Sequence, residues 1–217
     1  MTKNLQTRLF SILIILPVVF TIIFDGKIIF NLFLISCFVL AVIEWINLVK
    51  KITYKYFGIL FLIISFLSAY KIRNYFEDNT LNQYFFFYIL IVCIFTDIGG
   101  FFFGKLIKGP KLTKISPNKT ISGSVGALVL SIFAAFLFSN LIDISNLPVF
   151  LNIYFYSITI ILSIVSQLGD LSISFFKRKY KVKDTGNLIP GHGGILDRID
   201  GMLFVFPITF LIVLNIS

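Results

Sequence analysis

Residues 122–142 read SGSVGALVLSIFAAFLFSNLI and contain no charged side chain. A helix needs roughly 20 consecutive apolar residues to cross the hydrocarbon core of a bilayer. The chain has seven apolar segments, of which the third is short for such a crossing. They cover about 9–24, 28–49, 57–70, 83–103, 122–142, 148–169 and 201–216. The sequence therefore predicts an all-α, polytopic integral membrane helical bundle with about seven transmembrane helices.

The composition excludes an ordinary soluble domain. Of the 217 residues, 58% are hydrophobic and only 13% are charged, with a net charge of +9. A soluble domain is about a quarter charged, so this chain has too few charges to form a polar shell. The positive excess is small beside the apolar content, which argues against a nucleic-acid partner. Cys37 and Cys93 lie in apolar runs and indicate neither a disulfide framework nor a zinc site.

The basic residues predict the orientation in the membrane. If the N-terminus is cytoplasmic, four segments face the cytoplasm and contain 16 of the 19 Lys and Arg residues. These segments are 1–8, 50–56, 104–121 and 170–200. Such a bias toward the cytoplasmic side is typical of membrane proteins. We therefore expect a cytoplasmic N-terminus and an external C-terminus.

The distribution of glycine differs between the first and the second part of the chain. Twelve of the 14 glycines lie between Gly99 and Gly201, and glycine lets a backbone approach a ligand closely. We interpret 1–96 as N-terminal transmembrane helices and 97–217 as a C-terminal catalytic membrane region with two cytoplasmic loops.

Five acidic residues lie within predicted spans or at their cytoplasmic ends: Glu44, Asp97, Asp170, Asp197 and Asp200. A carboxylate near hydrocarbon is costly and usually faces a cavity, a metal or a partner. We favour a functional role for Asp170, Asp197 and Asp200. The role of Asp97 is left open, since this residue could also cap a helix end. Glu44 is expected to face the bundle or to anchor the interface beside Trp45.

The spacing of these acids indicates a magnesium site. If 166–181 is a helix, Ser166, Asp170 and Ser174 share one face, which continues into a basic cluster. If 197–210 is a helix, Asp197 and Asp200 are neighbours on it. Mg²⁺ takes oxygen ligands and is usually held by one or two carboxylates plus substrate phosphates.

The basic residues around these acids have two compatible interpretations. They neutralise substrate phosphates, or they contact anionic lipid as a positive cytoplasmic loop. The residues concerned are Lys177, Arg178, Lys179, Lys181, Lys183 and Arg198.

Two short motifs lead elsewhere and are set aside. Gly99–Lys105 fits a phosphate-binding G-x-x-x-x-G-K pattern, but Leu106 stands where a metal-binding Ser or Thr is needed. His192-Gly193-Gly194 is similar to a hydrolase oxyanion loop, but no G-x-S-x-G is present. His192 is either structural or in contact with substrate.

Residues 174–200 resemble the signature of phosphatidate cytidylyltransferases, the CDP-diacylglycerol synthases. The matching pieces are Ser174-Phe175-Phe176-Lys177-Arg178, Lys183-Asp184-Thr185-Gly186 and Pro190-Gly191-His192-Gly193-Gly194-Ile195-Leu196-Asp197-Arg198-Ile199-Asp200. Residues 97–104 (DIGGFFFG) and 115–120 (ISPNKT) also look like this family. Asn118 and Ser122 depart from it, since the family often has Lys and Glu there.

The resemblance implies an activity. CTP and phosphatidic acid would give CDP-diacylglycerol and pyrophosphate, with Mg²⁺, in phospholipid biosynthesis. It also implies an integral membrane protein of the bacterial inner membrane with its active site on the cytoplasmic side. A monovalent cation such as K⁺ and a homodimer are left open, and no nucleic acid is expected.

The resemblance also implies residue roles. Asp170 and Asp197 correspond to the metal ligands, with Asp200 near them. As further catalytic groups we expect Ser174, Lys183 and His192. For substrate binding we expect Lys177, Arg178, Arg198, Gly193, Gly194 and Lys119.

Two other functions are weighed against this one. The first is a CTP-dependent membrane polyprenol or lipid kinase, which would phosphorylate a lipid alcohol. The second is a transporter with an intramembrane ion path, whose acids should be spread through the spans. Here most of them cluster at cytoplasmic ends, which counts against a transporter.

Overall fold

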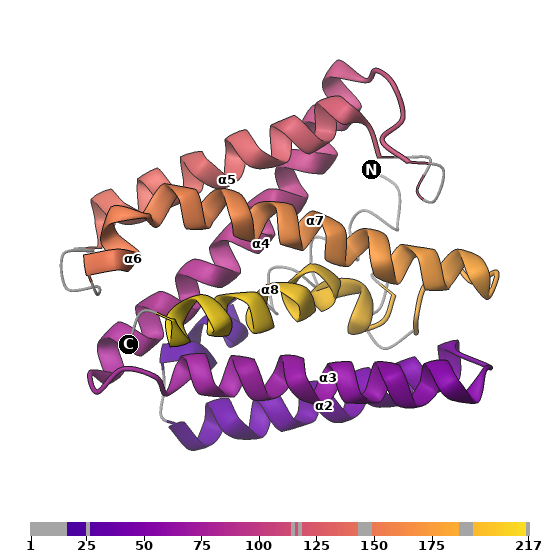
Figure 1. Ribbon diagram of the computed structural model, residues 1–217, viewed down its shortest axis with the longest axis horizontal. Helices are drawn as coiled ribbons and strands as arrows, with labels where there is room; N and C mark the ends of the chain where they lie inside the picture. Colours follow the sequence, from indigo (N-terminus) through magenta and orange to yellow (C-terminus); the bar gives the residue numbers. More distant parts are fainter. Residues whose placement is uncertain are drawn as a thin grey trace. The chain divides into compact units, whose positions relative to one another are not determined.

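The computed structural model describes residues 17–24, 27–113, 116, 119–142, 149–186 and 193–215. These residues form helices (Figure 1), and the only β-pairing among them is one isolated bridge between Lys111 and Thr120. Residues 17–24 are helical. The later helices are α2 (Lys27–Leu48), α3 (Ile52–Arg73), α4 (Asn79–Ile107), α5 (Ile121–Leu141), α6 (Val149–Ile153), α7 (Phe155–Lys179) and α8 (Leu196–Leu214).

Five of the described helices, α2, α3, α4, α5 and α7, are long and apolar enough to cross a membrane. The predicted all-α polytopic membrane fold is therefore confirmed. The count of seven stays a prediction, because the first predicted segment is described only from residue 17 and α8 is not among the five.

The outer face of α2 is apolar, as expected of a helix in lipid. Its exposed large side chains recur every three or four residues, and the side chain of Ile28 is 75% exposed. This stripe consists of Ile28, Leu32, Ile35, Val39, Ile43 and Ile46. A soluble helix would place such a stripe against a core, so its exposure here fits a hydrocarbon environment.

Several helices extend beyond the predicted apolar segments. The third segment, predicted at 57–70, belongs to a helix from Ile52 to Arg73. The prediction that this segment is short for a bilayer crossing was therefore wrong. The sixth, predicted as one segment at 148–169, is two helices: it covers α6 and the first part of α7, which runs on to Lys179. The reason is that backbone hydrogen bonding continues past the hydrocarbon boundary into polar residues, whereas an apolar run ends there.

The contacts within the chain divide it into two compact units. Unit 1 comprises Met1–Tyr70 and Phe176–Ile199, and unit 2 comprises Lys71–Phe175 and Asp200–Ser217. The boundaries fall within α3, α7 and α8. The functional division into 1–96 and 97–217 is a different kind of division and stays a prediction.

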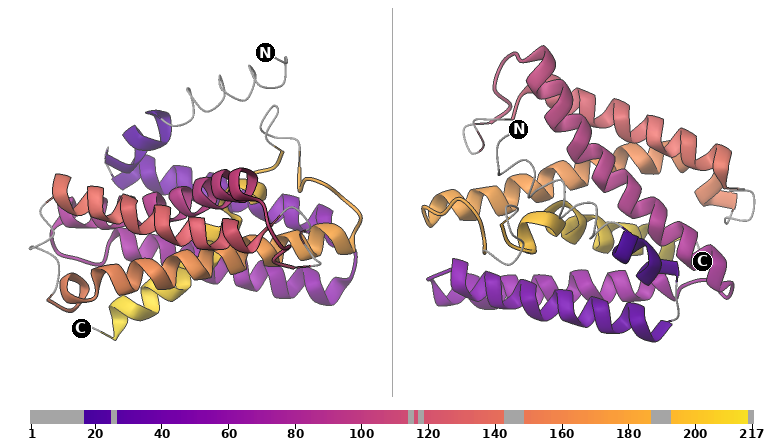
Figure 2. Two further views of the ribbon diagram at one scale, coloured as in Figure 1. Left: turned by 90° about the horizontal axis from the view of Figure 1, so that it is seen from above. Right: turned by 180° about the vertical axis from the view of Figure 1, so that it is seen from behind.

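In unit 1, α2 and α3 form a hairpin of adjacent helices (Figures 1 and 2). The Trp45 indole lies over Gly58, where an added Cβ would come within 1.9 Å of the ring, so only glycine allows this approach. The indole N–H donates to the carbonyl of Tyr54 at 3.2 Å, and the ring meets Phe176 edge-on with centroids 4.9 Å apart. These contacts tie the hairpin to the last turn of α7, which belongs to the same unit.

In unit 2, α4 and α5 pack through glycines (Figure 2). A Cβ on Gly99 would lie 2.6 Å from the carbonyl oxygen of Gly126, and one on Gly123 would lie 2.7 Å from that of Gly100. Small residues at such a crossing let two membrane helices approach closely. Part of the glycine enrichment after residue 98 therefore serves helix packing.

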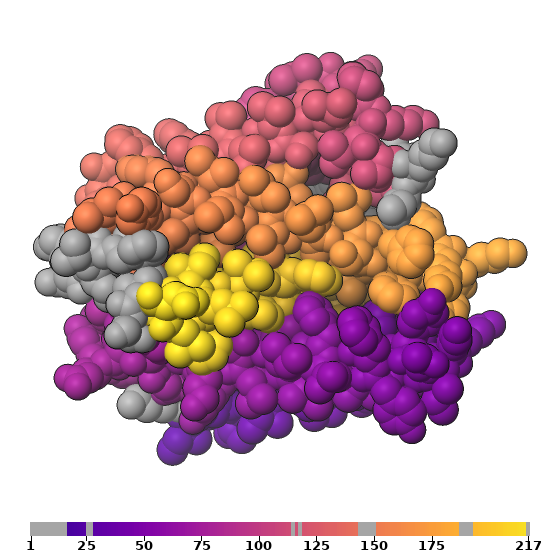
Figure 3. All heavy atoms as spheres, viewed as in Figure 1, coloured from indigo at the N-terminus to yellow at the C-terminus, as the bar shows by residue number. Residues whose placement is uncertain are grey.

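Hydroxyl pairs and close packing hold the other helices of unit 2 together. The Thr96 hydroxyl of α4 donates to the Ser163 hydroxyl of α7 at 2.9 Å, and both side chains are buried. Within this unit, α7 and α8 are in direct contact on the face drawn in Figure 3. At this contact a Cβ on Gly169 would lie 2.8 Å from the Asp200 carbonyl oxygen.

Candidate active site

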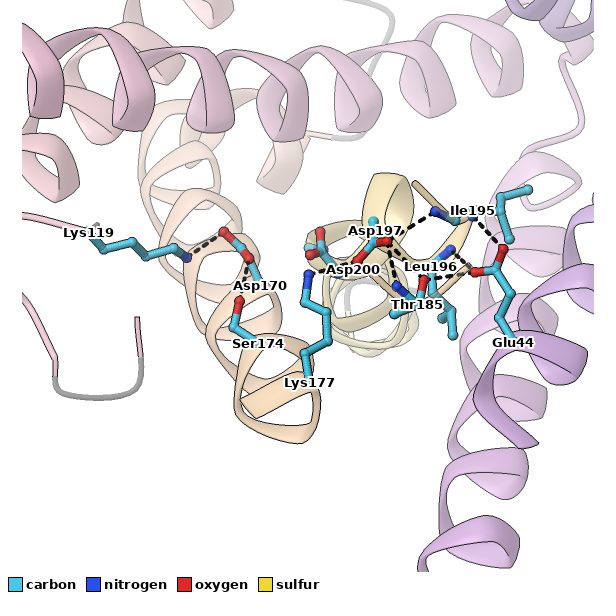
Figure 4. Close-up of polar contacts among 12 residues, drawn as sticks. Glu44, Lys119, Asp170, Ser174, Lys177, Thr185, Ile195, Leu196, Asp197 and Asp200 are labelled. Atoms are coloured by element: carbon cyan, nitrogen blue, oxygen red, sulfur yellow. Dashed lines mark hydrogen bonds and ion pairs between the residues drawn. The ribbon is translucent and has the colours of Figure 1, made fainter. Parts of the chain in front are cut away.

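In unit 1, the Asp197 carboxylate in the first turn of α8 accepts hydrogen bonds from three residues (Figure 4). The Lys177 ammonium donates to Oδ1 at 2.7 Å, and the backbone N–H groups of Thr185 and Gly194 donate to Oδ2 at 2.8 and 3.1 Å. The Asp197 side chain is 5% exposed and that of Lys177 is 14% exposed. Asp197 is therefore a buried carboxylate held in one orientation.

The donors decide the charge of Asp197. Burial by itself raises the pKa of this carboxyl, but the hydrogen bonds and charge of Lys177 and the two backbone N–H groups outweigh burial. Its pKa lies below the ordinary value of an aspartate. The group is therefore ionised at neutral pH, as a metal ligand or an anchor for a cation must be.

The segment before α8 needs glycine to reach this geometry. Gly193 has a φ of +86°, in the left-handed region that L side chains rarely adopt. A Cβ at this position would also lie 2.8 Å from Oδ2 of Asp197. The Gly194 N–H, predicted to bind a substrate anion, donates to Asp197 in this structure; its substrate role stays a prediction.

In unit 2, Asp170 of α7 forms a second carboxylate cluster. Its Oδ2 pairs with the Lys119 ammonium, and its Oδ1 accepts a hydrogen bond from the Ser174 hydroxyl at 3.2 Å, one helical turn later (Figure 4). The predicted helical spacing of Asp170 and Ser174 is confirmed. Their roles in catalysis are untested.

Lys119 is placed by the turn before α5. Its N–H donates to the Ser116 carbonyl at 3.0 Å, and its carbonyl accepts from Leu112 N–H at 2.8 Å. The next residue, Thr120, caps α5 by accepting the Gly123 N–H at 3.1 Å. Lys119 and Thr120, the last two residues of the ISPNKT stretch, therefore supply a lysine paired with Asp170 and the cap of α5.

The remaining predicted site residues lie as follows. Asp200 is buried in the part of α8 that belongs to unit 2, and its Oδ1 accepts the Gly201 N–H at 2.8 Å. Arg178, Lys183 and Arg198 are exposed in unit 1. His192 lies outside the described residues.

Two other acids receive a clear position. Asp97 lies inside α4, well before its last residue Ile107, so a role as a helix-end cap is wrong. Glu44 lies inside α2 and is 5% exposed. Of its two expected positions, inside the bundle or at the interface, the structure favours the first.

Sequence reasoning missed the partners of Glu44. Its carboxylate accepts the Thr185 hydroxyl at 2.9 Å and the N–H groups of Ile195 and Leu196 at 2.8 and 2.9 Å. The available signal was a lone carboxylate in the apolar run 28–49. That signal shows that a partner is needed but not which one.

Each aspartate offers carboxylate oxygens, which are the ligand type that Mg²⁺ prefers. Ser174 adds a hydroxyl oxygen beside Asp170. Among the residues that the structure describes, no group of three or more His, Cys, Asp and Glu side chains is placed to hold a metal ion. Each cluster therefore offers oxygen atoms of the type that Mg²⁺ binds.

The helices and the two carboxylate clusters define an integral membrane protein in which lysines, hydroxyls and backbone N–H groups hold a buried acid, Asp197, and a half-buried one, Asp170. The sequence model of the family described as "Cytidylyltransferase family" matches residues 60–216. The chain belongs to this family, and the resemblance found in its motifs is confirmed.

Individual relatives carry a more specific name. The phosphatidate cytidylyltransferase of Rickettsia bellii (strain RML369-C) is 36% identical over 223 residues, covering 97% of this chain and 91% of that protein. That of Bacillus subtilis (strain 168) is 40% identical over 179 residues, covering 80% and 65%. That of Staphylococcus saprophyticus is 40% identical over 142 residues, covering 65% and 53%. The match thus spans between about half and nine-tenths of these relatives.

Proposed function

We propose that this chain is a membrane cytidylyltransferase that transfers CMP from CTP to phosphatidic acid, giving CDP-diacylglycerol and pyrophosphate. The observation that carries the proposal is the similarity to proteins named phosphatidate cytidylyltransferase, which in one case extends over 97% of this chain. The buried Asp197 cluster in the signature segment supports it, because phosphate chemistry needs ionised carboxylates and cations close together.

The chemistry makes modest demands on the protein. An oxygen of the phosphatidic acid phosphate forms a bond to the α-phosphorus of CTP. The bond from that phosphorus to the bridging oxygen breaks, and pyrophosphate leaves with the electron pair. Because the nucleophile is already an anion, no strong general base is required. The protein contributes positioning and neutralisation of charge.

The exposed cations of unit 1 suit this task. The side chains of Arg178, Lys183 and Arg198 are exposed, so a phosphate can approach them from solution. Charge-assisted hydrogen bonds from such side chains are about twice as strong as neutral ones. Lys177 differs, because its ammonium is bound to Asp197 and so also fixes that carboxylate.

We further propose that Asp170 and Asp197 are Mg²⁺ ligands, each described in its own unit. When bound, the ion would neutralise charge on phosphate oxygens in the transition state. The residues themselves do the positioning: Ser174 orients Asp170, while Thr185 and Gly194 orient Asp197. A requirement for a monovalent cation is tested by exchanging K⁺ for a bulky organic cation.

The deciding experiment uses the full chain in detergent micelles or nanodiscs. CTP labelled in the cytosine and phosphatidic acid are supplied with Mg²⁺, with and without a chelator. We expect pyrophosphate release and label in the lipid, both lost with the chelator. Transfer of the γ-phosphate to a lipid alcohol, without label in the lipid, would instead support the kinase. The relatives described above lend the kinase function no support.

The active site is proposed on the cytoplasmic side of a bacterial inner membrane. The support is the excess of Lys and Arg in the four segments assigned to that side. In the variant Lys183→Cys, the new thiol should react with a membrane-impermeant maleimide only after the cytoplasmic face is opened. Labelling of intact spheroplasts would contradict this orientation.

The mass of the particle in detergent decides between monomer and homodimer.

A further inference from the structure

Glu44 is a buried carboxylate far from the signature segment in sequence but bound to it in unit 1 (Figure 4). Its two oxygens accept three hydrogen bonds, one from the Thr185 hydroxyl and two from the backbone before and at the start of α8. We propose that Glu44 is a positioning residue. It holds Thr185 and the start of α8, which both belong to the signature segment, so that Asp197 keeps its orientation. Its catalytic consequence rests on the proposed function.

The first argument concerns the start of α8. The first N–H groups of a helix have no partner within it, and a negative charge there is favourable. Glu44 supplies both needs from a different helix, because Oε1 accepts Ile195 N–H at 2.8 Å and Oε2 accepts Leu196 N–H at 2.9 Å. Asp197 follows immediately, so the carboxylate of α2 determines where the first turn of α8 begins.

The second argument concerns Thr185. Its Oγ1 lies 2.9 Å from Oε2 of Glu44 and 3.0 Å from Oδ2 of Asp197. A hydroxyl has one hydrogen and donates to one of these carboxylates at a time. Asp197 Oδ2 already accepts two N–H groups, from Thr185 and Gly194. Thr185 therefore links the two carboxylates, with its N–H on Asp197 and its hydroxyl available to Glu44.

The third argument is that the signature backbone is shaped around Glu44. A Cβ on Gly194 would lie 2.3 Å from Glu44 Oε2 and 2.4 Å from Thr185 Oγ1, and one on Gly186 would lie 2.7 Å from Oε1. Gly186 and Gly194 therefore permit the backbone to close on the carboxylate. Such outer partners of functional carboxylates typically matter by about 10- to 100-fold in metal affinity or activity.

The test compares Glu44→Gln with Glu77→Gln, the same chemical change at an exposed residue of unit 2. In Glu44→Gln one oxygen becomes an NH₂ group, which cannot accept the N–H or hydroxyl it faces. We expect kcat to fall about 10- to 100-fold with little change in the KM for CTP, and the Mg²⁺ concentration for half-maximal rate to rise. Glu77→Gln should match the wild type.

A second readout does not depend on activity. Hydrogen–deuterium exchange should become faster in peptides covering 185–197 of Glu44→Gln, while peptides from α5 stay unchanged. Wild-type kcat and wild-type exchange at 185–197 would overturn the proposal. Equally faster exchange in α5 would also overturn it, since Glu44 would then support only general stability. If the wild type itself fails to make CDP-diacylglycerol, the proposed function fails, but the exchange result still decides the placement of Glu44.

Discussion

The ion pair between Lys177 and Asp197 makes a prediction that a double-mutant cycle can test. Breaking a buried pair costs about 3–5 kcal/mol when the remaining charge has no other partner. Here Asp197 keeps two backbone N–H donors after Lys177→Met. The loss should therefore approach that of one hydrogen bond to a charged group, about 1.5–3 kcal/mol of unfolding free energy. Asp197→Asn should cost a similar amount or more.

The cycle isolates the interaction between the two side chains. Because the double variant Lys177→Met/Asp197→Asn removes both charges, it should lose less stability than the sum of the single variants. We expect a coupling energy of about 1.5–3 kcal/mol. Lys183→Met, at an exposed position of the same unit, should change stability by less than about 0.5 kcal/mol.

Trp45 provides the assay. It is the single tryptophan of the chain, belongs to unit 1 and contacts Phe176, which directly precedes Lys177. Its fluorescence during equilibrium unfolding in mixed micelles with increasing mole fraction of dodecyl sulfate reports the unit that contains the pair. Additivity of the two single variants within about 0.5 kcal/mol would refute the ion pair as a stabilising contact.

Three further predictions concern activity and packing. Asp170→Asn and Asp197→Asn should each abolish CTP-dependent turnover while the protein still inserts and elutes as a folded particle; near-normal turnover by purified Asp170→Asn would remove it from the metal site. Lys183→Ala should lower kcat/KM through a lost charge-assisted contact of about 1.5–3 kcal/mol, and an unchanged kcat/KM would exclude Lys183 from substrate binding. Gly58→Ala places a Cβ against the Trp45 ring, so it should cost about 1–3 kcal/mol and shift the Trp45 emission; a wild-type melting curve would contradict this packing.

Much of the site could be predicted from the chain because it lies within one helix or one motif. Asp170 and Ser174 are one turn apart, so their contact follows from helix geometry alone. The register of the signature segment identified Lys177 and Asp197, although not their hydrogen bond. Lys119 was expected as a substrate-binding residue, whereas in the structure it pairs with Asp170. A contact between residues so far apart in sequence has no periodicity that reveals it.

The helix boundaries show a second limit. Apolar runs located α2 and α5 to within a residue, because their flanking residues are polar or break the helix. The same runs placed the α7 segment too early, since the helix there continues through Asp170 to Lys179. Hydrophobicity reports where a chain meets lipid, while helical hydrogen bonding reports where the backbone is regular, and these limits need not coincide.

The sequence by itself determined that the chain is a helical membrane protein, which family it belongs to and which acids are candidates for the chemistry. These conclusions rest on composition, on local periodicity and on a motif of fixed spacing. Only the tertiary structure decided what holds the acids in place. Glu44 shows this most clearly, because one carboxylate in an apolar run predicts a partner, but only the folding of α2 against the signature segment selects Thr185, Ile195 and Leu196. Burial makes an unpaired charge too costly, so the fold had to bring donors from distant sequence to it.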